Sequence, residues 1–320
     1  MRPPAARFPE LIRLLAIIGP TATGKTPLAV AVAGHLAPAE LLNADSRQVI
    51  RGLQVATCAP TAHDLRGIPA HLFALHDPGE PFSVAAWLDA ARSALSALHT
   101  RQAQPILVGG TGLYVAALLD GLDLARVPAD PERRAQRSAQ AATPEGLQRL
   151  AAELAARDPD AAVDVRNLRR VVRALEILDA RGAPLHQARG RTAPIPATRI
   201  GLDAPRDLHD ALIAARARAM FETGALLEEV HSAMGRGVTR GALESAGIGY
   251  REALAVIDGQ ATSEQAIALV AQRTRRYAKA QRTWFRRDGR IRWLQRGEGP
   301  VEPLVDEVLD AFREDARVGQ

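Results

Sequence analysis

Several residue types are scarce in this 320-residue chain, and each shortage narrows the functions open to it. Cys58 is the only cysteine, which excludes an internal disulfide framework and a zinc site built from several cysteines. No apolar run approaches the roughly 18 residues that span a membrane. The opening segment MRPPAARFPE lacks the apolar stretch of a secretory signal. We therefore expect a cytoplasmic protein with no membrane partner.

Aromatic residues are also rare, at 4% of the chain, although 47% of its residues are hydrophobic. Ala, Leu and Val must supply most of the core, which suits helices and a buried parallel sheet better than an antiparallel sandwich. Lysine is scarcer still, because Lys25 and Lys279 are the only lysines among 41 basic residues. These two positions are candidates for contacts that need a compact ammonium group rather than a planar guanidinium.

Positive charge is concentrated near the C-terminus. Residues 273–292 contain nine Arg or Lys against one acid, Asp288, which gives this segment a net charge of +8. Because the whole chain carries +5, the remainder carries −3. A basic segment on a mildly acidic protein favours a polyanionic partner. A solvated arginine-rich helix is the alternative explanation.

Apolar runs and helical patterns alternate along the N-terminal third, with a further apolar run later in the chain. We expect strands at residues 11–19, 40–44, 104–110 and 198–204, and helices at residues 26–36, 83–101 and 111–121. Alternation of this kind predicts an α/β fold with a parallel, doubly wound sheet. Its site should lie at the carboxyl ends of the strands.

The strand pattern disappears in the middle of the chain. Residues 123–196 read as helices and turns, and the C-terminal third is again helical. We therefore expect three regions. Residues 1–122 form the first part of the core, residues 123–196 form an all-helical insertion, and residues 197–320 complete the core and add basic helices.

One segment between a predicted strand and a predicted helix matches the phosphate-loop pattern G-x-x-x-x-G-K-[ST]. Glycines allow backbone N–H groups to turn toward an anion, and the following helix N-terminus adds partial positive charge. Lys25 supplies a mobile cation, and the Thr26 hydroxyl is a candidate ligand of Mg²⁺. The pattern indicates phosphate binding but does not specify a reaction. The candidate phosphate-binding residues are Gly19, Pro20, Thr21, Ala22, Thr23, Gly24, Lys25 and Thr26.

Asp45 is the nearest acid at a strand end, 20 residues after Lys25. At the carboxyl end of the second predicted strand, it should face the same crevice as the phosphate loop. Three roles remain open for it: a carboxylate associated with a metal, a general base, or a cap for the following turn.

Two predicted helices each place basic residues on one face. A phosphate loop together with two such faces predicts a small phosphate ligand and a nucleic acid bound at the same time. The first face comprises Arg166, Arg169, Arg170 and Arg173, opposite the apolar Leu168, Val171, Val172 and Leu175. The second comprises Arg275, Lys279, Arg282 and Arg286.

Seven blocks of the sequence together resemble the tRNA dimethylallyltransferases, also called tRNA isopentenyltransferases. They run in the family's order from about Leu14 to Trp293, and the second and the last are the most specific. The blocks are GPTATGKT, NADSRQV, PAHLFALHDPGEPFSVAAW, PILVGGTGLYVAALLDG, NLRRVVRALEI, GIGYREAL and TRRYAKAQRTWFRR.

This resemblance implies a P-loop kinase-like core with a helical insertion that grips the anticodon stem-loop. It implies transfer of a dimethylallyl group from dimethylallyl diphosphate to N6 of adenine 37 in tRNA, with Mg²⁺ required. The phosphate loop would then hold diphosphate as the leaving group, without transferring phosphate. The resemblance further implies a monomer.

The resemblance also implies roles for individual residues. Asp45 acts as the general base, Lys25 and the loop amides neutralise the departing diphosphate, and Thr111 lines the channel near Asp45. The residues implied to contact tRNA are Asp45, Ser46, Arg47 and Gln48, then Arg169, Arg170, Val171, Val172 and Arg173, then Gly249, Tyr250 and Arg251. We add Arg275, Lys279 and Arg282 from the second basic face.

Three other functions share parts of this pattern. A small-molecule P-loop kinase would use the same loop and Asp45, but it has no need of the basic C-terminal segment. A prenyltransferase for free adenine nucleotides has less use for an arginine-faced insertion. A non-catalytic RNA-binding protein would not depend on Asp45.

The chain also departs from the family at Ala59, where the family commonly has lysine.

Overall fold

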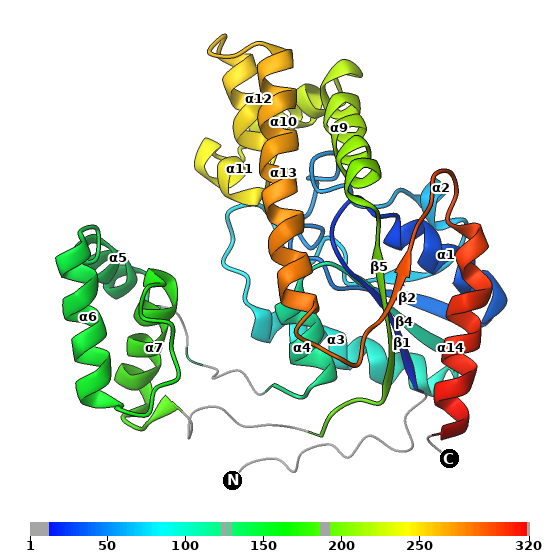
Figure 1. Ribbon diagram of the computed structural model, residues 1–320. Helices are drawn as coiled ribbons and strands as arrows, with labels where there is room; N and C mark the ends of the chain where they lie inside the picture. Colours follow the sequence, from blue (N-terminus) through cyan, green and yellow to red (C-terminus); the bar gives the residue numbers. More distant parts are fainter. Residues whose placement is uncertain (1–12, 123–126, 128–129, 186–192, 319–320) are drawn as a thin grey trace. The chain divides into compact units, whose positions relative to one another are not determined.

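Figure 1 shows the computed structural model, which describes residues 13–122, 127, 130–185 and 193–318. Contacts between Cα atoms divide the chain into two compact units. One comprises Met1–Leu119 and Pro194–Gln320, and the other comprises Asp120–Ala193. The insertion predicted at residues 123–196 begins with residues 123–126, which lie outside the described residues. No helix in the described part of the chain is long and apolar enough to cross a bilayer.

The first unit is built on a six-stranded sheet whose strand order is β3-β2-β4-β1-β5-β6. Every neighbouring pair is parallel. This confirms the predicted α/β core with a parallel sheet. The strands are β1 (Leu14–Ile18), β2 (Ala39–Asn43), β3 (Ala70–His71), β4 (Gln104–Gly109), β5 (Ala197–Asp203) and β6 (Arg292–Gln295).

Helices cover both faces of this sheet (Figure 1). On one face, α1 (Lys25–His35) and α14 (Val305–Val318) bury their apolar residues against alternate residues of β1, such as Leu15 and Ile17. The other face is covered by α3 (Val84–Thr100), which contacts β2 and β4, and α4 (Gly112–Leu119) packs against α3. The central strands are therefore buried on both sides, which explains their continuous apolar runs.

A group of helices follows β5 and carries several of the predicted contact residues. It begins with α9, which packs against α13 and α10. The group comprises α9 (Arg206–Glu222), α10 (Ala225–Gly235), α11 (Arg240–Ala246), α12 (Tyr250–Ile257) and α13 (Ser263–Phe285). Two shorter helices, α2 (Ala62–Leu65) and the 3₁₀ helix η1 (Glu302–Leu304), complete the unit.

The structure corrects the strand prediction in two places. Only helices are predicted after residue 204, but β6 extends the sheet by pairing in parallel with β5. The two-residue strand β3 was not predicted either. Both are too short to show a pattern, and β6 is partly exposed at the sheet edge, so pairing with a neighbour rather than apolar alternation defines them. Residues 11–12 of the first predicted strand lie outside the described residues.

The second unit contains α5 (Pro131–Gln140), α6 (Pro144–Arg157) and α7 (Leu168–Arg181). Its apolar core includes Leu150 and Leu154 of α6 and Leu175 of α7. Val171 and Val172 also belong to this core, with exposed fractions of 0% and 2%. Both side chains lie on the buried face of α7, and their predicted contact with tRNA stays a prediction. Arg169 and Arg170 on the same helix are exposed.

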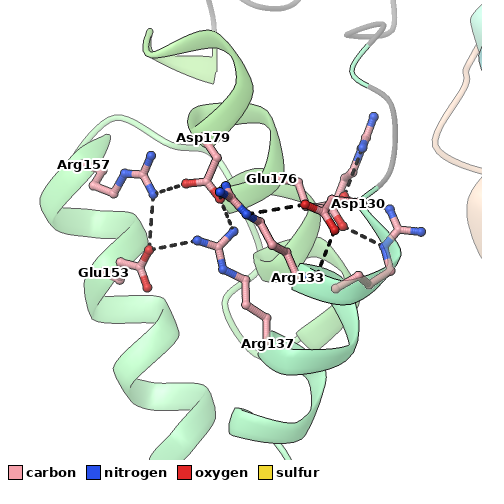
Figure 2. Close-up of polar contacts among 9 residues, drawn as sticks. Asp130, Arg133, Arg137, Glu153, Arg157, Glu176 and Asp179 are labelled. Atoms are coloured by element: carbon pink, nitrogen blue, oxygen red, sulfur yellow. Dashed lines mark hydrogen bonds and ion pairs between the residues drawn. The ribbon is translucent and has the colours of Figure 1, made fainter.

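Ion pairs join the three helices of this unit (Figure 2). Glu176 of α7 is buried and accepts two hydrogen bonds of 2.7 Å from Arg134 and one of 3.0 Å from Arg173. Asp179 pairs with Arg137 at 2.8 Å and with Arg157 at 2.7 Å. Arg173, a predicted tRNA contact, is thus partly buried and committed to an internal acid.

The two carboxylates make the second unit sensitive to acid. Burial alone raises the pKa of Glu176, but hydrogen bonds from Arg134 and Arg173 outweigh it and hold the pKa below the usual 4.5. The pKa of Asp179 likewise lies below 3.8, because Arg157 and Arg137 outweigh the effect of burial. A carboxyl group whose pKa is lower in the folded state than in the unfolded state stabilises the folded state. This contribution is complete at pH values above the unfolded-state pKa. We expect that contribution to disappear as the pH falls through the folded-state value.

We expect Glu176→Gln to destabilise the second unit by about 1.5 kcal/mol, because neutral hydrogen bonds replace the charge-assisted ones that Glu176 accepts from Arg134 and Arg173. Hydrogen exchange of α5–α7 in the full chain, followed by mass spectrometry, measures this local stability. Glu132→Gln, an exposed change on α5, is the matched control. Equal exchange in the two variants would contradict the role assigned to Glu176.

Candidate active site

The predicted phosphate loop, residues 19–26, connects β1 to α1 at the carboxyl edge of the sheet. Two glycines allow its path, since Gly19 has φ +134° and Gly24 has φ +91°. A Cβ atom on Gly19 would lie 2.5 Å from the carbonyl oxygen of Leu202. Gly24 immediately precedes α1, so the free N–H groups at the start of that helix are available to an anion.

Lys25 is the first residue of α1, and its side chain lies along the loop. Its Nζ donates to the carbonyl oxygen of Pro20 at 2.6 Å, and the buried hydroxyl of Thr23 donates to the same oxygen at 3.0 Å. Burial lowers the pKa of Lys25 to about 8, although the carboxylate of Asp45 opposes this shift. A cation beside the loop amides is the arrangement that suits a phosphate ligand.

The backbone and side chain of Thr21 are fixed by helices that follow it by 188 to 260 residues. Its N–H donates to Oε1 of Gln281 at 2.8 Å. Its carbonyl accepts from Nε2 of His209 at 2.8 Å, and its hydroxyl accepts from Arg216 at 3.2 Å. His209 and Arg216 belong to α9, and Gln281 belongs to α13. The C-terminal helices therefore hold the phosphate loop in place.

Arg282 completes this arrangement. Its guanidinium donates to both oxygens of Asp203 at 2.6 and 2.7 Å and to Nδ1 of His209 at 2.9 Å. Because arginine only donates, His209 carries its proton on Nε2, facing Thr21. Burial lowers the pKa of His209, which favours this neutral form. Arg282 is therefore an internal support of the loop, and its predicted contact with tRNA stays a prediction.

Asp45 lies just after β2, and its segment is anchored to the neighbouring strand end. One carboxylate oxygen accepts from the N–H of Arg47 at 2.8 Å, so Asp45 does cap the following turn. The N–H of Ser46 donates to Oγ1 of Thr111 at 2.9 Å, and the N–H of Thr111 donates to the carbonyl of Ala44 at 3.0 Å. The structure therefore brings Thr111 beside Asp45.

Two cavities meet at Asp45. The first, of about 690 Å³, includes Lys25 and Thr26 of the phosphate loop and is called here the loop cavity. The second, of about 360 Å³, includes Arg251 and Tyr277 from the C-terminal helices and is called here the helix cavity. Residues that line both cavities are Thr21, Asp45, Thr57, Cys58, Arg216 and Met220. One carboxylate is thus accessible to a ligand in either cavity.

The other predicted contact residues are distributed around these cavities. Arg47 and Arg251 line the helix cavity, and Gln48 lines the loop cavity. Arg47 also donates to the carbonyl oxygens of Ser245 at 2.9 Å and Ala246 at 3.3 Å. On α13, Lys279 is exposed.

Gly249 and Tyr250 are buried. Tyr250 has an exposed fraction of 0%, and its hydroxyl is bonded to Glu229 at 2.8 Å. Their predicted contact with tRNA stays a prediction. Arg275 is half-exposed but pairs with Asp210 at 3.3 Å, so it too is partly committed within the protein.

Four residues that support the phosphate loop were not predicted from the sequence: Asp203, His209, Arg216 and Gln281. Gln281 lies within the recognised block TRRYAKAQRTWFRR, and Asp203 ends a predicted strand, so both carried a signal. His209 and Arg216 lie on α9, and nothing in their local sequence points to the loop.

The chain is similar to known proteins over most of its length. The model of the IPP transferase family matches residues 48–288. A tRNA dimethylallyltransferase of Kineococcus radiotolerans is 40% identical over 302 residues, covering 92% of this chain and 93% of that protein. Another, of Mycobacterium avium, is 40% identical over 93% of this chain and 99% of that protein.

Solved structures agree with these relatives. A tRNA isopentenylpyrophosphate transferase from Bacillus halodurans is 35% identical with a TM-score of 0.68, covering 96% of this chain and 99% of that one. A eukaryotic dimethylallyltransferase, solved acting on tRNA, is 22% identical with a TM-score of 0.74 over 95% of this chain and 80% of that one. At that identity, the second similarity concerns the fold alone.

The support of Thr21 leads to a prediction about anion binding. Gln281→Ala removes the acceptor for the Thr21 N–H and the donor to the Gly110 carbonyl, which each lose a partner in a buried site. We expect the Kd for inorganic diphosphate, measured by calorimetry, to rise about tenfold, equivalent to about 1.4 kcal/mol. Gln272→Ala, an exposed change on the same helix, is the control. Unchanged binding in Gln281→Ala would contradict the supporting role.

Proposed function

The chain belongs to the IPP transferase family and transfers a dimethylallyl group to tRNA, and we propose that dimethylallyl diphosphate is the donor and N6 of adenine 37 the acceptor. Diphosphate is the other product. One observation carries this proposal: Asp45 lies where the loop cavity and the helix cavity meet. Dimethylallyl diphosphate in the loop cavity and an adenine in the helix cavity would then react beside the same carboxylate.

The loop cavity supports diphosphate binding. Lys25 and Arg216 both line it, and the N-terminus of α1 opens beside Gly24. As the bond between the prenyl carbon and the diphosphate oxygen breaks, negative charge grows on the oxygens, and these groups stabilise it. Carbon is transferred and both phosphorus atoms remain in the loop, which separates this use of a phosphate loop from phosphoryl transfer.

The helix cavity supports binding of a single unstacked base. Tyr277 lines it, together with the cations Arg47, Arg251 and Arg273. An adenine must leave its stack to enter, at a cost of a few kcal/mol. Its exocyclic amine is a weak nucleophile because its lone pair is delocalised into the ring. Asp45 takes the proton from that nitrogen as the new carbon–nitrogen bond forms.

The donor groups present also fit Mg²⁺. The hydroxyl of Thr26 and the carboxylate of Asp45 line the same cavity, and hard oxygen ligands are those that Mg²⁺ prefers. The described residues contain no group of three or more His, Cys, Asp or Glu placed to bind a metal. Mg²⁺ usually takes most of its ligands from phosphates and water, so a two-residue site is sufficient. When bound, Mg²⁺ would supply further charge neutralisation to the leaving group.

The tRNA would be held chiefly through its phosphates. Exposed cations available for this lie on both units and include Arg169 and Arg170 of α7 and Lys279 of α13. Phosphate contacts fix the register of a nucleic acid and weaken with salt. The anticodon stem-loop as the bound part, the monomeric state and the cytoplasmic location belong to the same proposal.

Asp45→Asn tests the proposal most directly. Asn can still accept from the Arg47 N–H, so the turn is kept while the base is lost. We expect kcat to fall by about 10²–10⁴ while the Kd for tRNA is retained. Mass spectrometry of tRNA nucleosides after incubation with dimethylallyl diphosphate measures the product. Asp207→Asn, an exposed change on α9, is the control.

The same assay separates the alternatives. Incubation with ATP in place of dimethylallyl diphosphate should give no phosphoryl transfer, and AMP in place of tRNA should accept no prenyl group. An Asp45→Asn variant that modifies tRNA at the rate of the unaltered chain would refute the assignment of Asp45 as the base.

A further inference from the structure

We propose that Glu229 and Tyr250 clamp the turn of residues 54–58, the dividing turn, and that this clamp sets the length of prenyl donor that reacts. The inference rests on the function proposed above and assigns positioning roles to two residues that touch no substrate. It follows from the burial of Tyr250, whose hydroxyl bonds to Glu229 in the protein interior.

Glu229 lies on α10 and receives three hydrogen bonds through its two carboxylate oxygens. Oε2 accepts from the backbone N–H of Gln54 at 2.5 Å and from that of Val55 at 2.9 Å. Oε1 accepts from the hydroxyl of Tyr250 at 2.8 Å. Hydrogen bonds to a charged acceptor are about twice as strong as neutral ones, so this one side chain fixes the start of the dividing turn firmly.

Tyr250 and Gly249 complete the clamp from the start of α12. Burial and the nearby Glu229 raise the pKa of Tyr250, so its hydroxyl remains a donor at any working pH. Gly249 has φ +114°, and an added Cβ atom would lie 3.0 Å from the Cβ of Ala56. The segment therefore approaches the dividing turn closely, which explains a glycine and a buried tyrosine at adjacent positions.

The far end of the dividing turn is held from the segment that carries Asp45. The amide Nε2 of Gln48 donates to the carbonyl oxygens of Thr57 at 3.2 Å and Cys58 at 2.8 Å. The turn is thus fixed at one end to α10 and at the other to the segment of Asp45. Thr57 and Cys58 line both cavities, so the position of the turn sets the width of the passage between them.

This passage is where the prenyl chain must lie during the reaction. The bond from its first carbon to the diphosphate oxygen breaks, the bond to N6 of adenine forms, and Asp45 takes the amine proton. A chain longer by one five-carbon unit needs more room beside Thr57 and Cys58. While the turn is clamped, the longer chain does not fit, and when the turn is released, it does. A shift of the turn by about 1 Å also lowers the rate with dimethylallyl diphosphate.

The test compares dimethylallyl diphosphate with geranyl diphosphate, each with the same tRNA. In Glu229→Ala and in Tyr250→Phe, we expect kcat for dimethylallyl transfer to fall, and the ratio of kcat/KM for the longer donor to that for the shorter one to rise about tenfold. The Kd for tRNA should stay within about twofold, because phosphate contacts dominate it. This ratio is informative because loss of folded protein lowers both rates equally and leaves it unchanged.

Two further variants separate hydrogen bonding from charge. In Glu229→Gln, the amide oxygen can accept from both backbone N–H groups while the amide nitrogen donates to the Tyr250 oxygen, so we expect a ratio near that of the unaltered chain. Glu228→Ala, an exposed neighbour on α10, should also leave the ratio unchanged.

The outcomes distinguish a failure of the clamp from a failure of the proposed function. A Glu229→Ala or Tyr250→Phe variant with an unchanged donor ratio would overturn the clamp, even if its rates were low. A Glu229→Gln variant that behaves like Glu229→Ala would overturn the hydrogen-bonding basis and assign the effect to charge. Absence of prenyl transfer by the unaltered chain would overturn the proposed function and this inference together.

Discussion

Hydrogen bonds to Thr21 are the constraint on which the candidate site depends. A phosphate loop that keeps one conformation before a ligand binds must be held against its own conformational entropy. Here Gln281, His209 and Arg216 hold it, and Arg282 with Asp203 fixes His209 in turn. The phosphate loop is therefore held jointly by β1, α1 and the helices that follow β5.

This joint construction also explains how one carboxylate comes to line two cavities. Asp45 stands at the carboxyl edge of the sheet, opposite the phosphate loop, while the C-terminal helices close a second cavity over it. The dividing turn narrows the passage between the cavities. Its two anchors, Glu229 and Gln48, belong to α10 and to the segment of Asp45.

Some arginines in this chain pair with buried acids, whereas others are exposed to solvent. Arg282 and Arg134 pair with acids that are largely buried, Asp203 and Glu176, because a buried carboxylate requires a close cation. Arg169, by contrast, lies in solvent. In the sequence, arginines at helical spacing show the same pattern whether they pair with a buried acid or are exposed to solvent. The excess of positive charge therefore indicates a polyanionic partner without identifying the residues that touch it.

The sequence by itself determined the parallel core, the phosphate loop and the position of Asp45 at a strand end, because these depend on local patterns of apolar residues and glycine. It could not determine that β6 joins the sheet, that Tyr250 faces inward, or that His209 and Arg216 reach the loop. Those features depend on hydrogen bonds and strand pairs between residues far apart in the sequence. Two hydrogen bonds to Thr21, for example, join residues separated by 188 and 260 positions. Only the packed tertiary structure decides such pairings, because hydrogen bonds form between groups that are near in space, however distant they are along the chain.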